Sequence, residues 1–173
     1  MSNNRRRKVI DVDFENLPDI RTAKDKSWRI IEDTYTDAIN QIEVPVDFDA
    51  NDILRINSLV DQVYAQARFD YAIAKKMSKR YDRRLGNAKK TLKLTFKKEK
   101  GQTADERDAL IYQYLATMPL PGDKEPLFTL VERWEEREIF MEAVIDNLNK
   151  ITDKLINGNG ALKLNSQGRG DVR

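Results

Sequence analysis

The chain has 173 residues, of which 40% are hydrophobic and 35% are charged, enough for one domain of ordinary size or a few long helices. It contains no cysteine and no histidine, which excludes disulfides, thiolate chemistry, the commonest zinc ligands and histidine-based triads. No dense acidic cluster suggests carboxylate chemistry, so we expect no enzyme activity, no metal site and no cofactor. No apolar run approaches the roughly 18 residues of a membrane span, and we expect a cytoplasmic protein with no membrane partner.

The formal net charge of +2 conceals a strong asymmetry along the chain. Residues 68–100 hold thirteen of the 31 Lys and Arg but only three of the 29 Asp and Glu, a net charge of +10 that leaves −8 for the remainder. Segregation of this size is expected in a protein that meets a polyanion, a lipid surface or an acidic protein. The alternative is a solvated helix face that only keeps the protein soluble.

The first fifty residues predict an irregular arm and one helix. Residues 1–19 show no extended periodicity and are read as the arm. From about Asp19 to Gln41, apolar residues recur at spacings of three and four, which indicates an amphipathic helix that Pro45 would end. Asp49 and Asn51 are then the candidate N-caps of the element that follows.

A second, longer helix is predicted from about residue 52 to residue 100. Its apolar seam runs from Ile53 to Leu85 at three-four spacing, and cations occupy the opposite side. Gly86-Asn87 is a common helix stop, and Lys90 to Lys98 alternates as a strand would. We favour continuation, because Leu92 and Phe96 stay in phase with the seam. The predicted basic face comprises Arg68, Lys75, Lys76, Lys79, Arg80, Arg83, Arg84, Lys90, Lys93, Lys97 and Lys98.

Two further helices are predicted in the last seventy residues. Thr103 and Glu106 fit a capping box that opens a short helix ending near Met118. A final amphipathic helix from Leu127 is acidic over its first half and is expected to pack against the long helix. We expect a helical domain over residues 20–156 and a flexible tail over residues 157–173. The predicted fold is all-α, a long antiparallel helical hairpin resembling a coiled coil, with an additional N-terminal helix and flexible tails.

Nucleic acid is the leading candidate partner for the basic face. Cations along a helix contact phosphates without reading sequence, and no zinc-finger spacing, RNP-type strand or compact helix-turn-helix pattern is present. Phe69 and Ile73 lie on the polar side of the helix. They are predicted either to stack on bases or to pack against a third helix or another subunit.

The order of elements resembles a known family. It consists of the Lys- and Arg-rich helix from Tyr64 to Lys100, the Gly-x-Thr-x-x-x-Arg-x-Ala entry over Gly101 to Ala109, and the closing helix from Leu127 to Ile156. Over about residues 51–156 this resembles phage proteins related to the UvsY-like recombination mediators. The resemblance implies an oligomer in the host cytoplasm that binds single-stranded DNA through the cations of residues 75–98. It also implies help in loading a recombinase onto strands coated by single-strand-binding protein.

A second function stays open. The basic face would instead contact acidic helices of protein partners, in a non-enzymatic structural or assembly protein such as a virion component or a chaperone. Both hypotheses predict a homo-oligomer, because a hairpin of two or three helices leaves apolar side chains uncovered.

Overall fold

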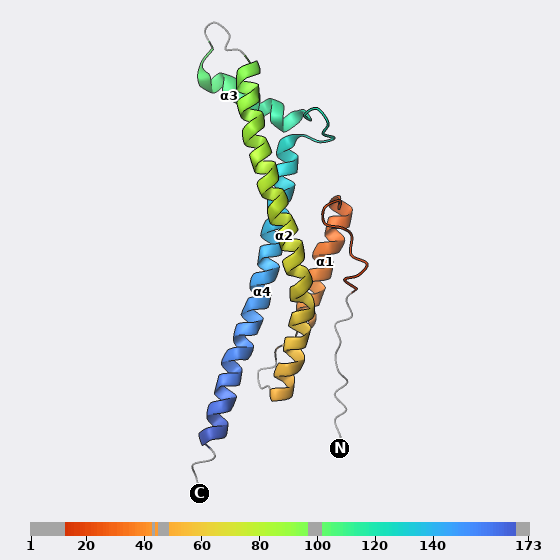
Figure 1. Ribbon diagram of the computed structural model, residues 1–173, viewed down its shortest axis with the longest axis vertical. Helices are drawn as coiled ribbons and strands as arrows, with labels where there is room; N and C mark the ends of the chain where they lie inside the picture. Colours follow the sequence, from red (N-terminus) through yellow and green to blue (C-terminus); the bar gives the residue numbers. More distant parts are fainter. Residues whose placement is uncertain (1–12, 43, 45–48, 97–101, 169–173) are drawn as a thin grey trace. The chain divides into compact units, whose positions relative to one another are not determined.

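The computed structural model describes residues 13–42, 44, 49–96 and 102–168, and over these ranges it contains helices and no strand. The helices are α1 (Asp25–Gln41), α2 (Ala50–Thr95), α3 (Ala104–Thr117) and α4 (Leu127–Gly168) (Figure 1). The all-α prediction is therefore confirmed. In this described part of the chain, no helix has both the length and the apolar composition needed to cross a bilayer. The chain divides into two units, Met1–Tyr71 with Phe140–Arg173, and Ala72–Ile139.

The first unit packs α1, the N-terminal part of α2 and the C-terminal part of α4 around an apolar core. The three-four pattern in the sequence predicts this core, since the buried residues follow it on all three helices: Trp28, Ile31, Tyr35, Ala38, Ile53, Ile56, Val60, Val63, Ala67, Met141, Val144, Leu148 and Leu155. The Tyr64 hydroxyl donates to Asn149 Oδ1 at 3.1 Å, and the Tyr71 hydroxyl donates to Glu142 Oε1 at 3.5 Å. The later residue of α2 meets the earlier residue of α4, so the two helices are antiparallel, as predicted.

A buried polar contact joins α1 to α2 in this unit. The Tyr35 hydroxyl, on a fully buried side chain, donates to Asp70 Oδ2 at 2.6 Å, and Gln66 Nε2 donates to the same oxygen at 3.2 Å. Burial raises the pKa of Asp70 above its usual value, and the two hydrogen bonds partly oppose that rise. Burial, followed by the bond to Asp70, also raises the pKa of Tyr35. The contact satisfies a hydroxyl that would otherwise be left without a partner in the core.

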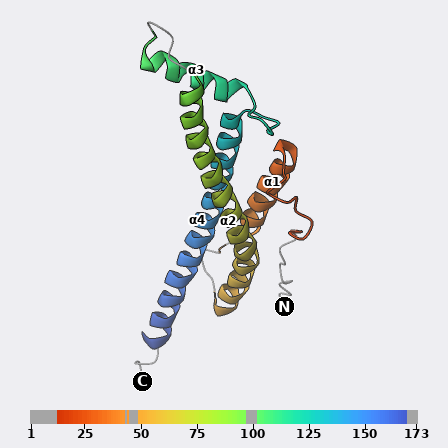
Figure 2. The same ribbon diagram turned by 45° about the horizontal axis from the view of Figure 1, so that its top comes forward.

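The second unit consists of the C-terminal part of α2, α3 and the N-terminal part of α4. Helix α3 runs across α2 (Figure 2). Ile111, Leu115 and Leu127 are buried at the centre of the unit. The predicted seam packs against them through Tyr81, Leu85, Ala88, Leu92 and Phe96. Burial of this side of α2 leaves the opposite side, which carries the cations, at the surface.

The two predicted N-terminal caps are present. Thr103 and Glu106 form the capping box at α3, with the Glu106 backbone N–H donating to Thr103 Oγ1 at 3.2 Å and the Thr103 N–H donating to Glu106 Oε2 at 2.7 Å. At α2, Asp49 rather than Asn51 is the cap, because its Oδ1 accepts the backbone N–H of Asp52 at 2.9 Å.

Helix α2 continues through Gly86, so the alternative strand at Lys90 is wrong. Gly86 does not have positive φ, and a Cβ atom there would meet nothing within 4 Å beyond the adjoining backbone of its own helix. The burial of Leu92 and Phe96 on the seam offsets the weak helix propensity of a single glycine, about 1 kcal/mol. Helix α2 ends at Thr95, before the predicted end near Lys100. Residues 97–101 lie outside the described residues, as do residues 1–12 of the arm.

Two further helix boundaries differ from the predictions. Residues 19–24 precede α1 outside the helix, with a turn at residues 20–22. Asp19 Oδ1 accepts the Arg21 backbone N–H at 2.9 Å, and such local bonds compete with helix. Helix α4 continues to Gly168, so the tail predicted from Asn157 is wrong over residues 157–168. A helix already formed extends at little cost, and Ala161 to Leu164 are good helix formers that follow Gly158 and Gly160.

Candidate nucleic-acid interface

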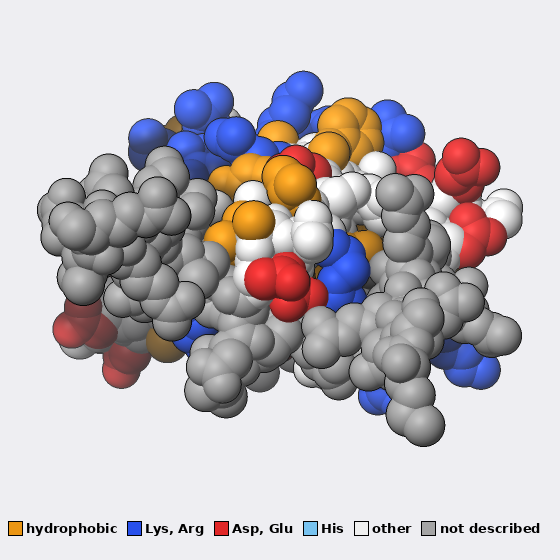
Figure 3. All heavy atoms as spheres, turned by 90° about the horizontal axis from the view of Figure 1, so that it is seen from below, with side chains coloured by type: hydrophobic (Ala, Val, Ile, Leu, Met, Phe, Trp, Pro, Cys, Tyr) orange, Lys and Arg blue, Asp and Glu red, His pale blue; other side chains and the backbone are white. Residues whose placement is uncertain are grey.

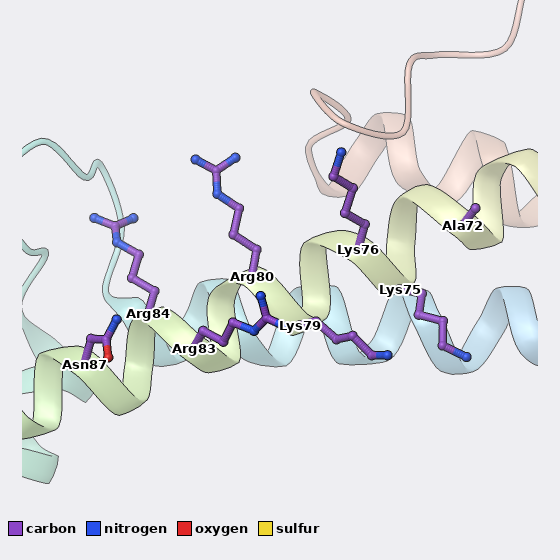
Figure 4. Close-up of a pocket in the computed structure, with 8 residues that line it drawn as sticks. All are labelled: Ala72, Lys75, Lys76, Lys79, Arg80, Arg83, Arg84 and Asn87. Atoms are coloured by element: carbon purple, nitrogen blue, oxygen red, sulfur yellow. The ribbon is translucent and has the colours of Figure 1, made fainter.

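The second unit carries a groove lined by cations along one face of α2. Its volume is about 760 Å³, and its lining residues are Ala72, Lys75, Lys76, Lys79, Arg80, Arg83, Arg84 and Asn87. All eight belong to one helix, as Figure 4 shows. The groove is therefore open along its length, unlike a small-molecule pocket that encloses its ligand. Six of the predicted interface residues are brought together here.

The cations form two rows that follow the turn of the helix. Lys76, Arg80 and Arg84 project in one direction in Figure 4, whereas Lys75 and Lys79 project in another. Within each row the side chains are four residues apart, which is about 6 Å along the axis. Pairs of like charge at this spacing repel by about 0.2–0.5 kcal/mol each. The arrangement therefore destabilises the isolated helix, and a bound polyanion would relieve that repulsion.

Two of the predicted cations are neutralised within the unit. Arg84 Nη1 donates to Asp123 Oδ1 at 2.8 Å, and Arg84 Nη2 lies 2.7 Å from Oδ2, an ion pair with the loop after α3. Lys93 Nζ contacts Asp108 Oδ2 on α3 at 2.7 Å. These ion pairs connect α2 to α3 and to the loop that follows α3. Periodicity could not reveal these pairs, because the partners are 39 and 15 residues away along the chain.

Four other cations of the groove are free of such ion pairs with described residues and can contact a ligand. Lys76, Lys79, Arg80 and Arg83 are exposed, and no carboxylate in the described ranges forms an ion pair with any of them. Lys90 is exposed as well, whereas Lys75 is half-buried. Because these exposed cations have no carboxylate partner within the described ranges, the groove carries uncompensated positive charge, which attracts an anionic ligand.

The remaining predicted residues lie elsewhere. Arg68, in the first unit, places its guanidinium 5.5 Å from the centre of the Tyr64 ring. Phe69, in the same unit, is 61% exposed. Ile73 is half-buried in the second unit. Lys97 and Lys98 lie outside the described residues. The alternatives of stacking or oligomer contact for Phe69 and Ile73 stay predictions.

Leu94 departs from the apolar seam in the sequence, which predicts an uncovered side chain, and it is 83% exposed on α2. Sequence reasoning missed Tyr112 on α3, which is 56% exposed. In the view from below (Figure 3), hydrophobic side chains of the described residues also reach the surface beside Lys and Arg side chains. Lys89, which departs from the basic face in the sequence, instead lies 5.3 Å from the centre of the Phe128 ring on α4. Contacts of this kind depend on the crossing of three helices, which no periodicity reveals.

Among the described residues, no group of three or more Asp or Glu side chains is placed to hold a metal ion. No protein-family model, curated protein sequence or solved structure matches this chain. Inference about function therefore depends on the groove, on its charge and on the resemblance in the sequence.

Proposed function

We propose that the chain binds single-stranded DNA through the groove on α2 and acts as an oligomeric recombination mediator. The observation that carries the proposal is the set of exposed cations, Lys76, Lys79, Arg80 and Arg83, with no carboxylate partner in the described ranges. Phosphates supply negative charge at regular intervals, and their condensed counterions are released when Lys and Arg replace them. Contacts of this type fix a strand by its backbone and read no sequence.

The form of the groove favours a polymer over a small anion. Its lining runs from Ala72 to Asn87, about 22 Å at 1.5 Å per residue. A single phosphate or carboxylate would engage only two or three of the cations and would leave the others repelling one another. A strand that follows the helix neutralises both rows.

The mediator role is supported by the resemblance over residues 51–156. It gives the chain three partners: single-stranded DNA, a recombinase and a single-strand-binding protein. Exposed apolar side chains in each unit, such as Ile30 and Leu94, support self-association. We expect the chain to raise the rate at which a recombinase displaces single-strand-binding protein from DNA.

A mobility-shift assay with single- and double-stranded oligonucleotides at low salt tests DNA binding. The test variant changes four groove cations to Glu: Lys76, Lys79, Arg80 and Arg83. Arg84 is kept because its replacement would leave the largely buried Asp123 carboxylate without its ion-pair partner. A control variant makes the same change of net charge at exposed positions of α1 and α4 in the other unit: Lys26, Arg29, Lys150 and Lys154.

The wild type and the control are expected to bind the single strand more tightly than the duplex. The test variant is expected to lose binding to both oligonucleotides. Equal binding by the test variant and the wild type would refute the proposal. Equal loss in both variants would show that net charge, rather than the groove, determines binding.

An assembly function is the second candidate, and one observation favours it. Helix α4 exposes Glu132, Glu135 and Glu136 in the second unit, so a neighbouring copy would offer the groove carboxylates of opposite charge. Light scattering separates the two functions. A defined oligomer that dissociates in the test variant and ignores added oligonucleotide would support assembly in place of DNA binding.

A further inference from the structure

An aromatic pair lies at the surface of the second unit, where α3 meets α4. The ring centroids of Tyr112 and Phe128 are 4.4 Å apart with the planes tilted by 46°. Tyr112 is 56% exposed, whereas Phe128 is half-buried and packs against the core of Ile111, Leu115 and Leu127. The core therefore holds Phe128, and Phe128 in turn supports a Tyr112 ring that stays largely in solvent.

The pair borders the basic face of α2. Lys89 Nζ lies 5.3 Å from the centre of the Phe128 ring. One turn further along α2, Lys93 contacts Asp108, which lies one turn before Tyr112 on α3. Lys90, the next residue after Lys89, is exposed and lies about 100° round the helix, on the side of the groove. Two adjacent cations of α2 therefore lie one at the aromatic pair, Lys89, and one on the side of the groove, Lys90.

We propose that Tyr112, supported by Phe128, is a stacking site for an unpaired nucleobase of the strand that the basic face holds. This inference rests on the proposed function. Every base has an aromatic face, so stacking on a tyrosine adds affinity without sequence preference. A duplex keeps its bases stacked inside the helix, so this site distinguishes single strands from double strands. The exposed Lys90 would contact a phosphate beside the stacked base.

The test compares an oligonucleotide of thymidines with an abasic oligonucleotide of the same length and charge, by fluorescence anisotropy at one fixed salt concentration. The wild type is expected to bind the thymidine strand about 5- to 150-fold more tightly, the range for stacking of one base. Tyr112→Ala is expected to remove most of this preference and to leave the affinity for the abasic strand unchanged. Tyr112→Phe should retain the preference, because it keeps the ring.

Leu110→Ala is the matched control, since Leu110 is 46% exposed on the same helix, and it should keep the preference. Circular dichroism checks that each variant is folded. An equal preference for bases in the wild type and in Tyr112→Ala would overturn the stacking site while the proposed function stands. Absence of binding to both oligonucleotides would instead overturn the proposed function itself.

Discussion

Arg83 and Arg84 are adjacent on α2 but differ in their partners, and this difference gives a sharp prediction for the groove. Arg83 is exposed and has no carboxylate partner in the described ranges, whereas Arg84 is bound through two contacts to Asp123. If the groove binds phosphates, Arg83→Gln removes one contact. Asp123→Asn does the opposite, because it releases Arg84 to contact the strand.

The size of each effect follows from counterion release. One phosphate contact on a single strand changes the slope of log K against log salt by about 0.7. At about 0.1 M salt this corresponds to roughly a fivefold change in Kd, and at about 0.5 M to less than twofold. Arg83→Gln should therefore weaken binding about fivefold at 0.1 M salt, and Asp123→Asn should strengthen it by up to the same factor.

Anisotropy titrations of a labelled thymidine oligonucleotide over a tenfold range of salt measure both slopes. Arg29→Gln, at an exposed position of α1, is the control for a general loss of charge. Circular dichroism is needed to check that Asp123→Asn remains folded, since the Asp123 side chain is 11% exposed and pairs with Arg84. Phosphate binding in the groove would be contradicted if both variants changed the slope in the same direction, or if neither changed it.

Three further predictions concern stability, measured by urea unfolding at 222 nm. Tyr35→Phe removes the 2.6 Å bond to Asp70 and should cost about 1.5–3 kcal/mol; a loss below about 0.5 kcal/mol would contradict the assigned contact. Because burial raises the pKa of Asp70 above its usual 3.8, the protonated carboxyl stabilises the fold below pH 3.8, and this contribution is lost as the pH rises through the folded-state pKa. The free energy of unfolding of Asp70→Asn should accordingly rise relative to the wild type over that pH window, and a constant difference would refute the assignment. Leu115→Ala, at a fully buried position, should cost about 2–5 kcal/mol, whereas Leu110→Ala should cost little.

The long helices could be predicted because their burial is periodic. The seam of α2 indicated that the helix passes Gly86, since Leu92 and Phe96 stay in phase beyond it, and the structure confirms this. The capping box at Thr103 was equally local and equally predictable. In each case, the residues that determine the structure lie within a few positions of one another.

Buried polar groups could not be predicted in the same way. On α4, the apolar pattern is interrupted at Glu138, and the inward position is taken by Arg137, which is 2% exposed and lies 4.8 Å from the centre of the Trp134 ring. Asp70 counted only as an acid within a basic stretch, yet it is the buried partner of a tyrosine 35 residues away. Pairings of this kind depend on which helices meet.

Ion pairs at the basic groove could not be predicted from the sequence either. Wheel geometry identified six of the eight residues that line the groove. It did not show that Arg84 is held by Asp123 or that Lys93 is held by Asp108. Neutralisation depends on the loop after α3 and on α3 itself, so the number of available cations is a property of the folded unit.

The two tryptophans of the chain are distributed so that each unit has its own fluorophore. Trp28 is 8% exposed and meets Phe140 edge-on at 5.6 Å in the first unit, whereas Trp134 is 3% exposed beside Arg137 in the second. Replacing either one by phenylalanine leaves a single emission spectrum that reports on one unit alone. Red shifts of the two spectra at different urea concentrations would show that the units melt separately, although both long helices run through them. Coincident shifts would show that the whole chain unfolds as one cooperative element.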